Sequence, residues 1–213
     1  MKNYFLSKNI IITAGPTWTA IDKVRVLSNI ASGETGTAIA AYAFKMGAKV
    51  TLLLGPGQIA LDNEFKKNIR ILEFKYFDEL YDLIKKEVRN KKYDIFIHSA
   101  AVSDYQPVKT SPGKIKSSQK ELTIKLKPTI KIVDQIKKID PSLFLVKFKL
   151  EIDKPKMQLI NIAYKSMLHS NADLIVANTL DKIFIINPSK EFVKVKKRGD
   201  LAKKLLEVIN RAF

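Results

Sequence analysis

The chain has 213 residues, 46% of them hydrophobic, and its 38 basic and 21 acidic side chains give a net charge of +17. This length and hydrophobic content predict a single globular domain that spans residues 1–213. The absence of cysteine excludes disulfides, thiolate metal sites and a thiol nucleophile, and the presence of only two histidines excludes a histidine-rich metal site.

Apolar runs alternate with helical periods along the chain. In chain order the pattern predicts a strand at 9–14, a helix at 35–46, strands at 49–54 and 69–74, a helix at 77–90, a strand at 93–99, a helix at 130–138, a strand at 144–150, a helix at 156–170, a strand at 173–178 and a helix at 200–211. Such alternation predicts an α/β fold of three layers, Rossmann-like, with a mostly parallel sheet and helices on both faces. Ligands are then expected at the carboxyl ends of the strands.

The segment VLSNIASGETGT, residues 26–37, lies between the first strand and the first helix. Backbone N–H groups and the dipole at a helix start bind anions, so this turn is the first expected ligand site. It is not a dinucleotide fingerprint, because its glycines come too late after the strand. The strand KVTLLL also ends in Gly55-Pro56-Gly57, where a ribose-binding carboxylate belongs. Both departures argue against NAD.

Two stretches fall outside this alternation. Residues Glu121–Lys127 alternate as ELTIKLK and predict a projecting strand, which pairs either locally or with a second subunit. We expect its apolar stripe to contribute to a homodimer. The stretch IFIINPSKEFVKVKK predicts a hairpin that turns at 187–190.

The sequence also indicates the compartment and the class of partner. No apolar run is long enough to span a bilayer, and the start MKNYFLSKNIII runs into a strand rather than a cleavage site. We therefore expect a cytoplasmic protein that does not bind membranes. Lysine is scattered over almost every segment, which favours a solvated basic surface over a nucleic-acid site or a field that steers phosphates.

Several motifs, taken together and in order, resemble those of phosphopantothenoylcysteine synthetases. They are ITAGPT, the segment Ile21–Arg25, LSNIASGETG, HSAAVSDYQPV, the KIK of Lys114–Lys116, and NADLIVAN. The resemblance runs from about Ile10 to Ala212. In many bacteria this domain follows a flavin-containing decarboxylase; no such domain precedes it in this sequence, so we expect the stand-alone ligase.

The resemblance implies a two-step ligation. A nucleoside triphosphate, with CTP favoured and ATP possible, activates the carboxylate of 4'-phosphopantothenate as an acyl-nucleotidyl anhydride and releases pyrophosphate. The amine of cysteine then attacks the acyl carbon and releases the nucleoside monophosphate. All reactants of the first step are anions, so cationic side chains and Mg²⁺ are expected to hold them together.

The resemblance also assigns residues to roles. The expected catalytic residues are Asn29, Lys114 and Arg25. The expected nucleotide-binding residues are Ala100, Asp104, Lys114, Phe148, Lys165 and His169. The expected substrate-binding residues are Ser28, Asn29, Ser32, Gly33 and Ala101. No protein metal ligand is expected.

Most of these residues keep a structural alternative. Lys114 can be a solvated surface lysine, and Asn29 and Asp104 can stabilise their own turns. Arg25 can clamp phosphate or carboxylate, or pair with Asp22. Phe148 can belong to the core. The second histidine, His98, lies inside a predicted strand and is expected to be structural rather than a base.

The sequence departs from the family pattern in three places. Lys147 stands where the family usually has glycine, Thr129–Ile132 with Lys131 replaces Asn-Pro-Asp-Ile, and Thr179 replaces an acidic residue. These departures leave the choice between CTP and ATP open. Two other classes also remain: a basic α/β nucleic-acid-binding protein, and a Rossmann-like nucleotide-dependent oxidoreductase or flavoprotein.

Overall fold

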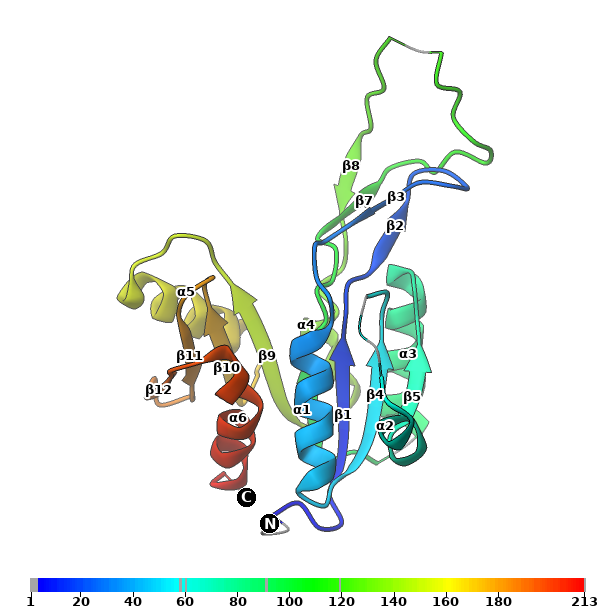
Figure 1. The fold of residues 1–213 in the computed structure, drawn as a ribbon. Coiled ribbons are helices and arrows are strands. Elements are labelled where there is room, and N and C mark those ends of the chain that lie inside the picture. Colours follow the sequence, from blue (N-terminus) through cyan, green and yellow to red (C-terminus); the bar gives the residue numbers. More distant parts are fainter. Residues whose placement is uncertain (1–3, 58, 60, 91, 119, 213) are drawn as a thin grey trace.

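The computed structural model describes residues 4–57, 59, 61–90, 92–118 and 120–212. Its centre is an eight-stranded sheet with the order β12-β11-β10-β9-β6-β1-β4-β5 (Figure 1). These strands are β1 Asn9–Ala14, β4 Lys49–Leu54, β5 Arg70–Glu73, β6 Ile95–His98, β9 Phe144–Leu150, β10 Leu174–Asn178, β11 Ile183–Ile186 and β12 Phe192–Val195. The six strands from β10 to β5 run parallel to one another, and β11 pairs antiparallel with both β10 and β12.

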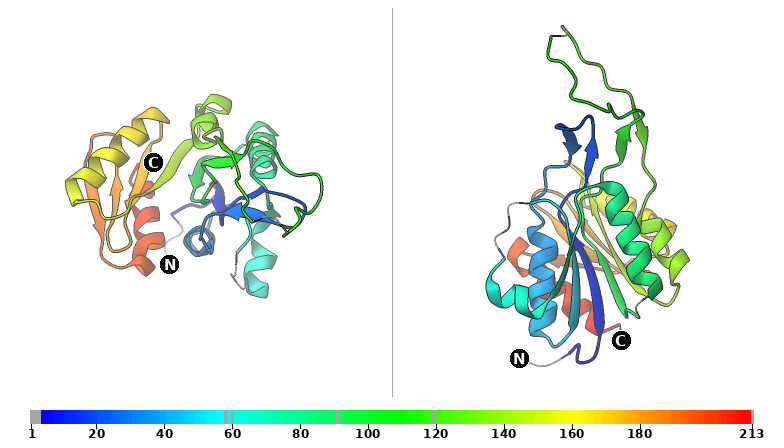
Figure 2. Two further views of the ribbon diagram at one scale, coloured as in Figure 1. Left: turned by 90° about the horizontal axis from the view of Figure 1, so that it is seen from above. Right: turned by 90° about the vertical axis from the view of Figure 1, so that its right-hand side faces the viewer.

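Helices cover both faces of this sheet (Figure 2). They are α1 Glu34–Lys45, α2 Asn63–Asn68, α3 Phe77–Asn90, α4 Val133–Ile139, α5 Lys156–His169 and α6 Leu201–Asn210, with a 3-10 turn at Arg198–Asp200 before α6. Helices α1, α2 and α6 lie on one face, and α3, α4 and α5 on the other. The predicted three-layer α/β fold with a mostly parallel sheet is confirmed.

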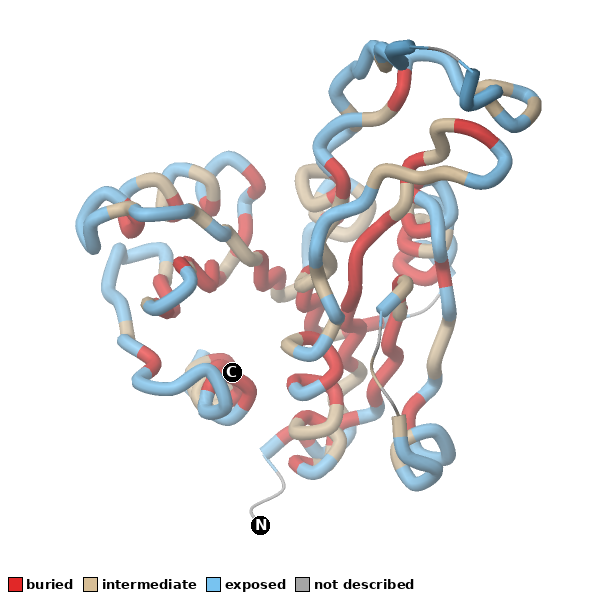
Figure 3. Tube along the Cα trace, turned by 45° about the horizontal axis from the view of Figure 1, so that its top comes forward, coloured by how far each residue is buried: buried red, intermediate tan, exposed pale blue. Residues whose placement is uncertain are grey.

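Strand β1 shows why the sheet is buried on both sides. Successive side chains of a strand point to opposite faces. Ile10 and Ile12 accordingly pack beneath α1, while Ile11 packs on the face of α3, and none of the three is exposed. A continuous apolar run is typical of such a doubly covered parallel strand. Figure 3 shows the central strands as the most deeply buried part of the chain.

Two short antiparallel pairs rise above the carboxyl edge of the sheet. Strands β2 (Trp18–Ala20) and β3 (Val26–Ser28) form one pair, and β7 (Tyr105–Pro107) and β8 (Leu126–Pro128) form the other. We call residues 105–128 the arm. It projects from the body of the molecule and is mostly exposed (Figures 1 and 3).

The predicted strand at Glu121–Lys127 is wrong in extent. The structure has a strand only at Leu126–Pro128, which pairs locally with β7, and residues 121–125 are not in a strand. An alternating pattern needs a neighbouring strand to hydrogen-bond with, and the arm offers only three residues of one. Leu122 and Leu126 remain 43% and 45% exposed and Ile124 is partly buried, so the described residues leave much of the apolar stripe uncovered.

The remaining elements divide into confirmed and missed ones. The other predicted strands and helices occur within a few residues of their expected bounds. The hairpin β11–β12 turns as expected at 187–190, where Lys190 takes a positive φ of 63° and Asn187 Oδ1 accepts from Glu191 N. The pair β2–β3 and the helix α2 were not predicted. Among the described residues, no helix is both long and apolar enough to cross a membrane.

Candidate active site

A cleft of about 760 Å³ opens at the carboxyl ends of β6, β9 and β10. The chain runs outward from β1 to β4 and β5, then returns to place β6 on the other side of β1. Ligands bind at such a reversal in open α/β sheets. The cleft is lined by residues 29–31 and Thr35, by 98–102 and Asp104, by 129–134, by 147–150, by Ser166 and His169, and by Asn178, Ile183, Arg198 and Leu201.

The loop after β6 supplies one wall. Ala101 N donates to Gly15 O at 3.0 Å, and Thr17 N donates to Ala101 O at 3.3 Å. Ala100 N donates to Thr13 Oγ1 at 3.1 Å. These bonds lay the segment after β6 alongside the segment after β1. Ala100 and Ala101 therefore present small side chains to the cleft, which lets a ligand approach the backbone.

Asn29 ties a second loop to this wall. Its Nδ2 donates to Ala101 O at 3.1 Å and to Val102 O at 3.2 Å. The amide therefore stabilises the contact between two loops rather than its own turn. No hydrogen bond within the described residues reaches Asn29 Oδ1, so this oxygen can accept from a ligand in the cleft.

The turn that precedes α1 brings the helix start to the cleft. Gly33 has a φ of +86°, and a Cβ there would lie 3.0 Å from Gly15 N. Gly36 packs even more closely, because a Cβ would lie 2.6 Å from Ala14 Cβ. Glycine at both positions lets α1 begin directly on the end of β1. Thr35, in the first turn of α1, lines the cleft.

His98 and Lys147 lie next to each other on β6 and β9 and are both buried. His98 Nδ1 is 3.0 Å from Thr13 Oγ1. Burial, together with the charge of Lys147, lowers the pKa of His98 to about 4, so its ring is neutral at pH 7. His98 also lines the cleft, so its expected structural role stays a prediction.

Lys147 is the buried cation of the cleft. Its Nζ donates to Ser166 O at 2.9 Å and to Ser170 Oγ, and Ser170 Oγ bonds in turn to Asp134 Oδ1. Burial lowers the pKa of Lys147 to about 8, although the nearby Asp134 carboxylate opposes this effect. The lysine thus connects β9 with α5 and, through Ser170, with α4.

Two polar side-chain pairs line the cleft. Asp104 pairs with Lys131, and His169 Nε2 lies 3.4 Å from Asp134 Oδ2. Asp104 therefore has a partner from the loop that departs from the family pattern, rather than an Asx-turn of its own. Of the two predicted residues on α5, His169 lines the cleft, whereas Lys165 is exposed outside its lining.

The structure brings together half of the predicted residues. Asn29, Ala100, Ala101, Asp104, Phe148 and His169 all line the cleft. Ser28, Ser32 and Gly33 lie beside lining residues but not in the lining, and Ser28 Oγ donates to Thr17 O at 3.3 Å. Lys114 belongs to the arm and Arg25 to the β2–β3 turn, and neither is in the lining. Both of these segments lie above the carboxyl edge of the sheet (Figure 1). Thr179 is buried, with its Oγ1 bonded to Asp181.

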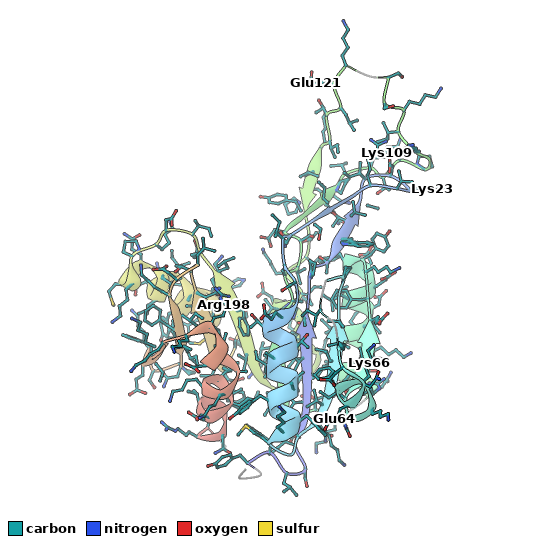
Figure 4. All side chains as sticks on the ribbon, viewed as in Figure 1. Lys23, Glu64, Lys66, Lys109, Glu121 and Arg198 are labelled. Carbon is teal, nitrogen blue, oxygen red and sulfur yellow. The ribbon has the colours of Figure 1, made fainter. Side chains whose placement is uncertain are left out.

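Sequence reasoning missed several polar residues of the lining, among them Arg198 and Asp134. Arg198, labelled in Figure 4, faces the cleft from the turn before α6, and its Nη2 lies 3.4 Å from Thr179 O. Asp134 starts α4. Arg198 belongs to a lysine-rich run with no motif of its own, so only the fold reveals it. Asp134 comes shortly after Thr129–Ile132, which departs from the family pattern. This nearby departure was the feature of the sequence that could have pointed to Asp134.

The family described as DNA/pantothenate metabolism flavoprotein C-terminal domain matches residues 5–211. The chain belongs to this family. It is 38% identical over 204 residues to the coenzyme A biosynthesis bifunctional protein CoaBC of Thermococcus kodakarensis, an alignment that covers 96% of this chain and 48% of that protein. The chain thus spans about half the length of this curated relative.

Solved structures of the family superpose over nearly the whole chain. The DNA/pantothenate metabolism flavoprotein from Streptococcus pneumoniae is 29% identical, with a TM-score of 0.85 over 97% of this chain and 99% of that chain. The C-terminal domain of the bifunctional protein CoaBC is 26% identical, with a TM-score of 0.83 over 99% and 98%. The architecture around the cleft is therefore that of the C-terminal domain of this family.

Proposed function

We propose that this chain condenses 4'-phosphopantothenate with cysteine through an acyl-nucleotidyl intermediate. The observation that carries the proposal is the convergence of Asn29, Ala100, Ala101 and Asp104 in one cleft at the reversal of strand order. These residues come from two motifs far apart in the sequence. Their family includes a relative named for coenzyme A biosynthesis. The same chain alone is expected to catalyse both half-reactions.

The charge of the cleft suits a triphosphate. Four cationic side chains, Lys131, Lys147, Lys149 and Arg198, line it against the two carboxylates of Asp104 and Asp134. The start of α1 adds the partial positive charge of a helix N-terminus near Thr35. Opposite charges held in a partly buried cleft attract more strongly than in bulk water. We propose CTP as the favoured nucleotide and ATP as the alternative.

Mg²⁺ is proposed to arrive with the nucleotide. Among the described residues, no three acidic or histidine side chains gather as a metal site. Mg²⁺ commonly binds substrate phosphates with only one or two protein carboxylates, and Asp104 and Asp134 are the carboxylates of the cleft. Bound Mg²⁺ would neutralise charge on the pyrophosphate as it leaves.

Asn29 and Lys114 are proposed to act in different half-reactions. Lys114 stabilises the charge that develops at the α-phosphate during activation. Asn29 orients the cysteine amine during its attack on the acyl-nucleotide, because its Oδ1 can accept from that amine while its Nδ2 stays bonded to Ala101 O and Val102 O. Phe148 and the Ala100-Ala101 step line the place proposed for the nucleotide. Arg25, Ser28, Ser32 and Gly33 are proposed to complete the phosphopantothenate side.

A homodimer is proposed as the working form. Five apolar side chains of the arm and of the neighbouring β2–β3 turn are exposed: Val24, Tyr105, Val108, Leu122 and Leu126. A second copy of the arm offers the same surface, and mutual burial would remove both from water. Cytoplasmic residence, where free cysteine and nucleotides are available, completes the proposal.

The test is a direct assay of the purified chain. Phosphopantothenate, cysteine and Mg²⁺ are mixed with CTP or with ATP, and pyrophosphate and the amide product are followed by chromatography. The proposal predicts both products in equal amounts, with omission of cysteine leaving only a single turnover of pyrophosphate. Salt-sensitive binding of unrelated nucleic acids without product would favour the nucleic-acid-binding alternative.

A further inference from the structure

One ion pair of the β2–β3 turn holds a single residue of the arm by both of its backbone polar groups. Asp22 Oδ2 accepts from Ile115 N at 3.0 Å, and Arg25 Nη2 donates to Ile115 O. Arg25 Nε lies 3.3 Å from the same Asp22 oxygen, which closes the arrangement. We call Asp22, Arg25 and the two backbone groups of Ile115 the clamp.

The β2–β3 turn also holds the second carboxylate oxygen of Asp22. Its other oxygen, Oδ1, accepts from Val24 N at 2.9 Å and from Arg25 N at 2.8 Å. The residue is only 4% exposed, although it lies near the tip of a hairpin. The N–H of Ile115, then those of Val24 and Arg25 and the Arg25 charge, lower the pKa of Asp22, so it is ionised at neutral pH. A carboxylate that accepts several N–H bonds forms strong, directional contacts.

The clamp fixes the two peptide groups that flank Ile115. The N–H of Ile115 belongs to the peptide that joins it to Lys114, and its C=O belongs to the peptide that joins it to Lys116. Holding both groups fixes the orientation of both peptide planes. The starting directions of the Lys114 and Lys116 side chains are thereby set from outside the arm.

Little else holds this part of the arm. In the described residues of 109–124, the hydrogen bonds to other segments all end on residues 20–25. Besides those of the clamp, they are Ser111 N to Ile21 O at 3.0 Å and Thr110 Oγ1 to Ala20 O at 3.2 Å. None of the described residues in that range is buried. Figure 4 labels Lys109 on the arm and Lys23 on the β2–β3 turn.

We propose that Asp22 is a positioning residue for the activation step, acting through the Ile115 backbone to set the direction from which Lys114, which lies outside the lining of the cleft, approaches the nucleotide. This inference rests on the proposed function, because it gives Asp22 a part in delivering Lys114. It also gives Arg25 a second role besides any contact with phosphopantothenate. Asp22 does not line the cleft. Its effect on catalysis therefore passes through the arm or through Arg25, and only the part that passes through the arm depends on Lys114.

Asp22→Asn should disrupt the clamp while leaving the β2–β3 turn intact. Asparagine keeps a carbonyl oxygen for Val24 N and Arg25 N, the usual arrangement in an Asx-turn. Its Nδ2 then faces the N–H of Ile115. Because both groups are donors, the hydrogen bond to Ile115 is lost, and so is the negative charge that pairs with Arg25. Asp62→Asn is the matched control, because Asp62 caps α2 by accepting from Phe65 N far from the arm.

The decisive measurement is a double-mutant cycle on the rate of pyrophosphate release in a single turnover, with enzyme in excess over nucleotide so that slow variants remain measurable. Misplacing a catalytic group by about 1 Å can lower a rate up to about 100-fold, so we expect Asp22→Asn to slow this release by about 10- to 100-fold. In a Lys114→Gln background the same change should have little further effect, because its route to the reaction is already removed. Equal losses in both backgrounds, or no loss in the wild-type background, would overturn the positioning role.

Limited proteolysis with trypsin tests the clamp without relying on catalysis. Cleavage after Lys114 and Lys116 requires the clamped backbone to open, so Asp22→Asn should be cut there at least several-fold faster than wild type or Asp62→Asn. Unchanged cleavage would overturn the clamp itself. If the wild type releases no pyrophosphate, the proposed function fails and the positioning role with it, while faster cleavage of Asp22→Asn would still support the clamp.

Discussion

Lys147 offers a test of the electrostatics of the cleft. It is a lysine within a buried parallel strand, 6% exposed, with its ammonium held by Ser166 O and Ser170 Oγ. Replacing it with methionine keeps an unbranched apolar side chain one atom shorter than lysine and removes the charge. The folded state then no longer bears the cost of a buried ammonium.

The magnitude follows from the pKa of Lys147, which lies at about 8 against 10.5 for an ordinary lysine. At 1.36 kcal/mol per pKa unit, the upper limit is about 3 kcal/mol, and contact with water in the cleft reduces it to about 1–2 kcal/mol. Below pH 8 the folded and unfolded states both carry the charge, so the folded state bears the full cost. Between pH 8 and 10.5 the unfolded state binds more protons, so the free energy of unfolding rises with pH.

Urea unfolding followed by circular dichroism measures this directly. Relative to Lys147→Met, the wild type should gain about 1–2 kcal/mol between pH 7.5 and 10.5. Subtracting the free energy of unfolding of Lys147→Met at each pH removes the contribution of the other lysines and tyrosines. Lys149→Met, on the same strand and paired with Glu151, controls for the loss of one positive charge. A difference between wild type and Lys147→Met that stays constant with pH would refute the reasoning.

Further predictions concern catalysis, the turn before α1 and assembly. Lys114→Gln should lower turnover by about 100-fold and abolish most of the pyrophosphate burst while the fold persists; near-normal turnover would remove its assignment. Asn29→Asp should still release one pyrophosphate per site, accumulate the acyl-nucleotide and form little amide in quenched-flow chromatography, whereas a folded variant without intermediate would contradict the division of roles. Gly33→Ala should destabilise by about 1–3 kcal/mol in urea, because φ is +86° and the added Cβ meets Gly15 N; no loss would contradict that geometry. The chain should sediment at twice 24.1 kDa, and Leu122→Lys with Leu126→Lys should weaken this dimer; a wild-type monomer at all concentrations would refute it.

The body of the fold could be predicted from the sequence because each element carries a periodic signal. The run Asn9–Ala14 is apolar on both faces and follows the pattern of a covered parallel strand. The helix α3 shows a clear apolar face, and its bounds agree with the prediction. These signals are local, and packing reinforces them.

The arm could not be predicted in the same way. Leu122, Ile124 and Leu126 alternate as in a strand, but alternation indicates only which side chains share a face and does not supply a pairing partner. The pair β2–β3 was missed because each strand has three residues, too few for a periodic signal. Short pairs of this kind depend on contacts between distant segments.

The candidate site was predictable where motifs follow strands. The Ala100-Ala101 step and Asn29 come to the cleft because parallel strands end at the same edge. Asp22 was noticed only as an alternative partner for Arg25, since its contact with Ile115 spans 93 residues of sequence. Lys147 was recognised as a departure, but its link to Ser170 and Asp134 required the packing of α4 and α5 against β9.

The central claim is that a carboxylate oxygen attacks the α-phosphorus of the nucleotide. Phosphopantothenate labelled with ¹⁸O in its carboxylate tests this during one round of synthesis with cysteine, Mg²⁺ and CTP. In the first step the labelled oxygen bonds to the α-phosphorus and pyrophosphate leaves; in the second the amine displaces the nucleotide from the acyl carbon. The account predicts one ¹⁸O in the nucleoside monophosphate and none in pyrophosphate by mass spectrometry. Label in inorganic phosphate or pyrophosphate, with unlabelled monophosphate, would contradict it.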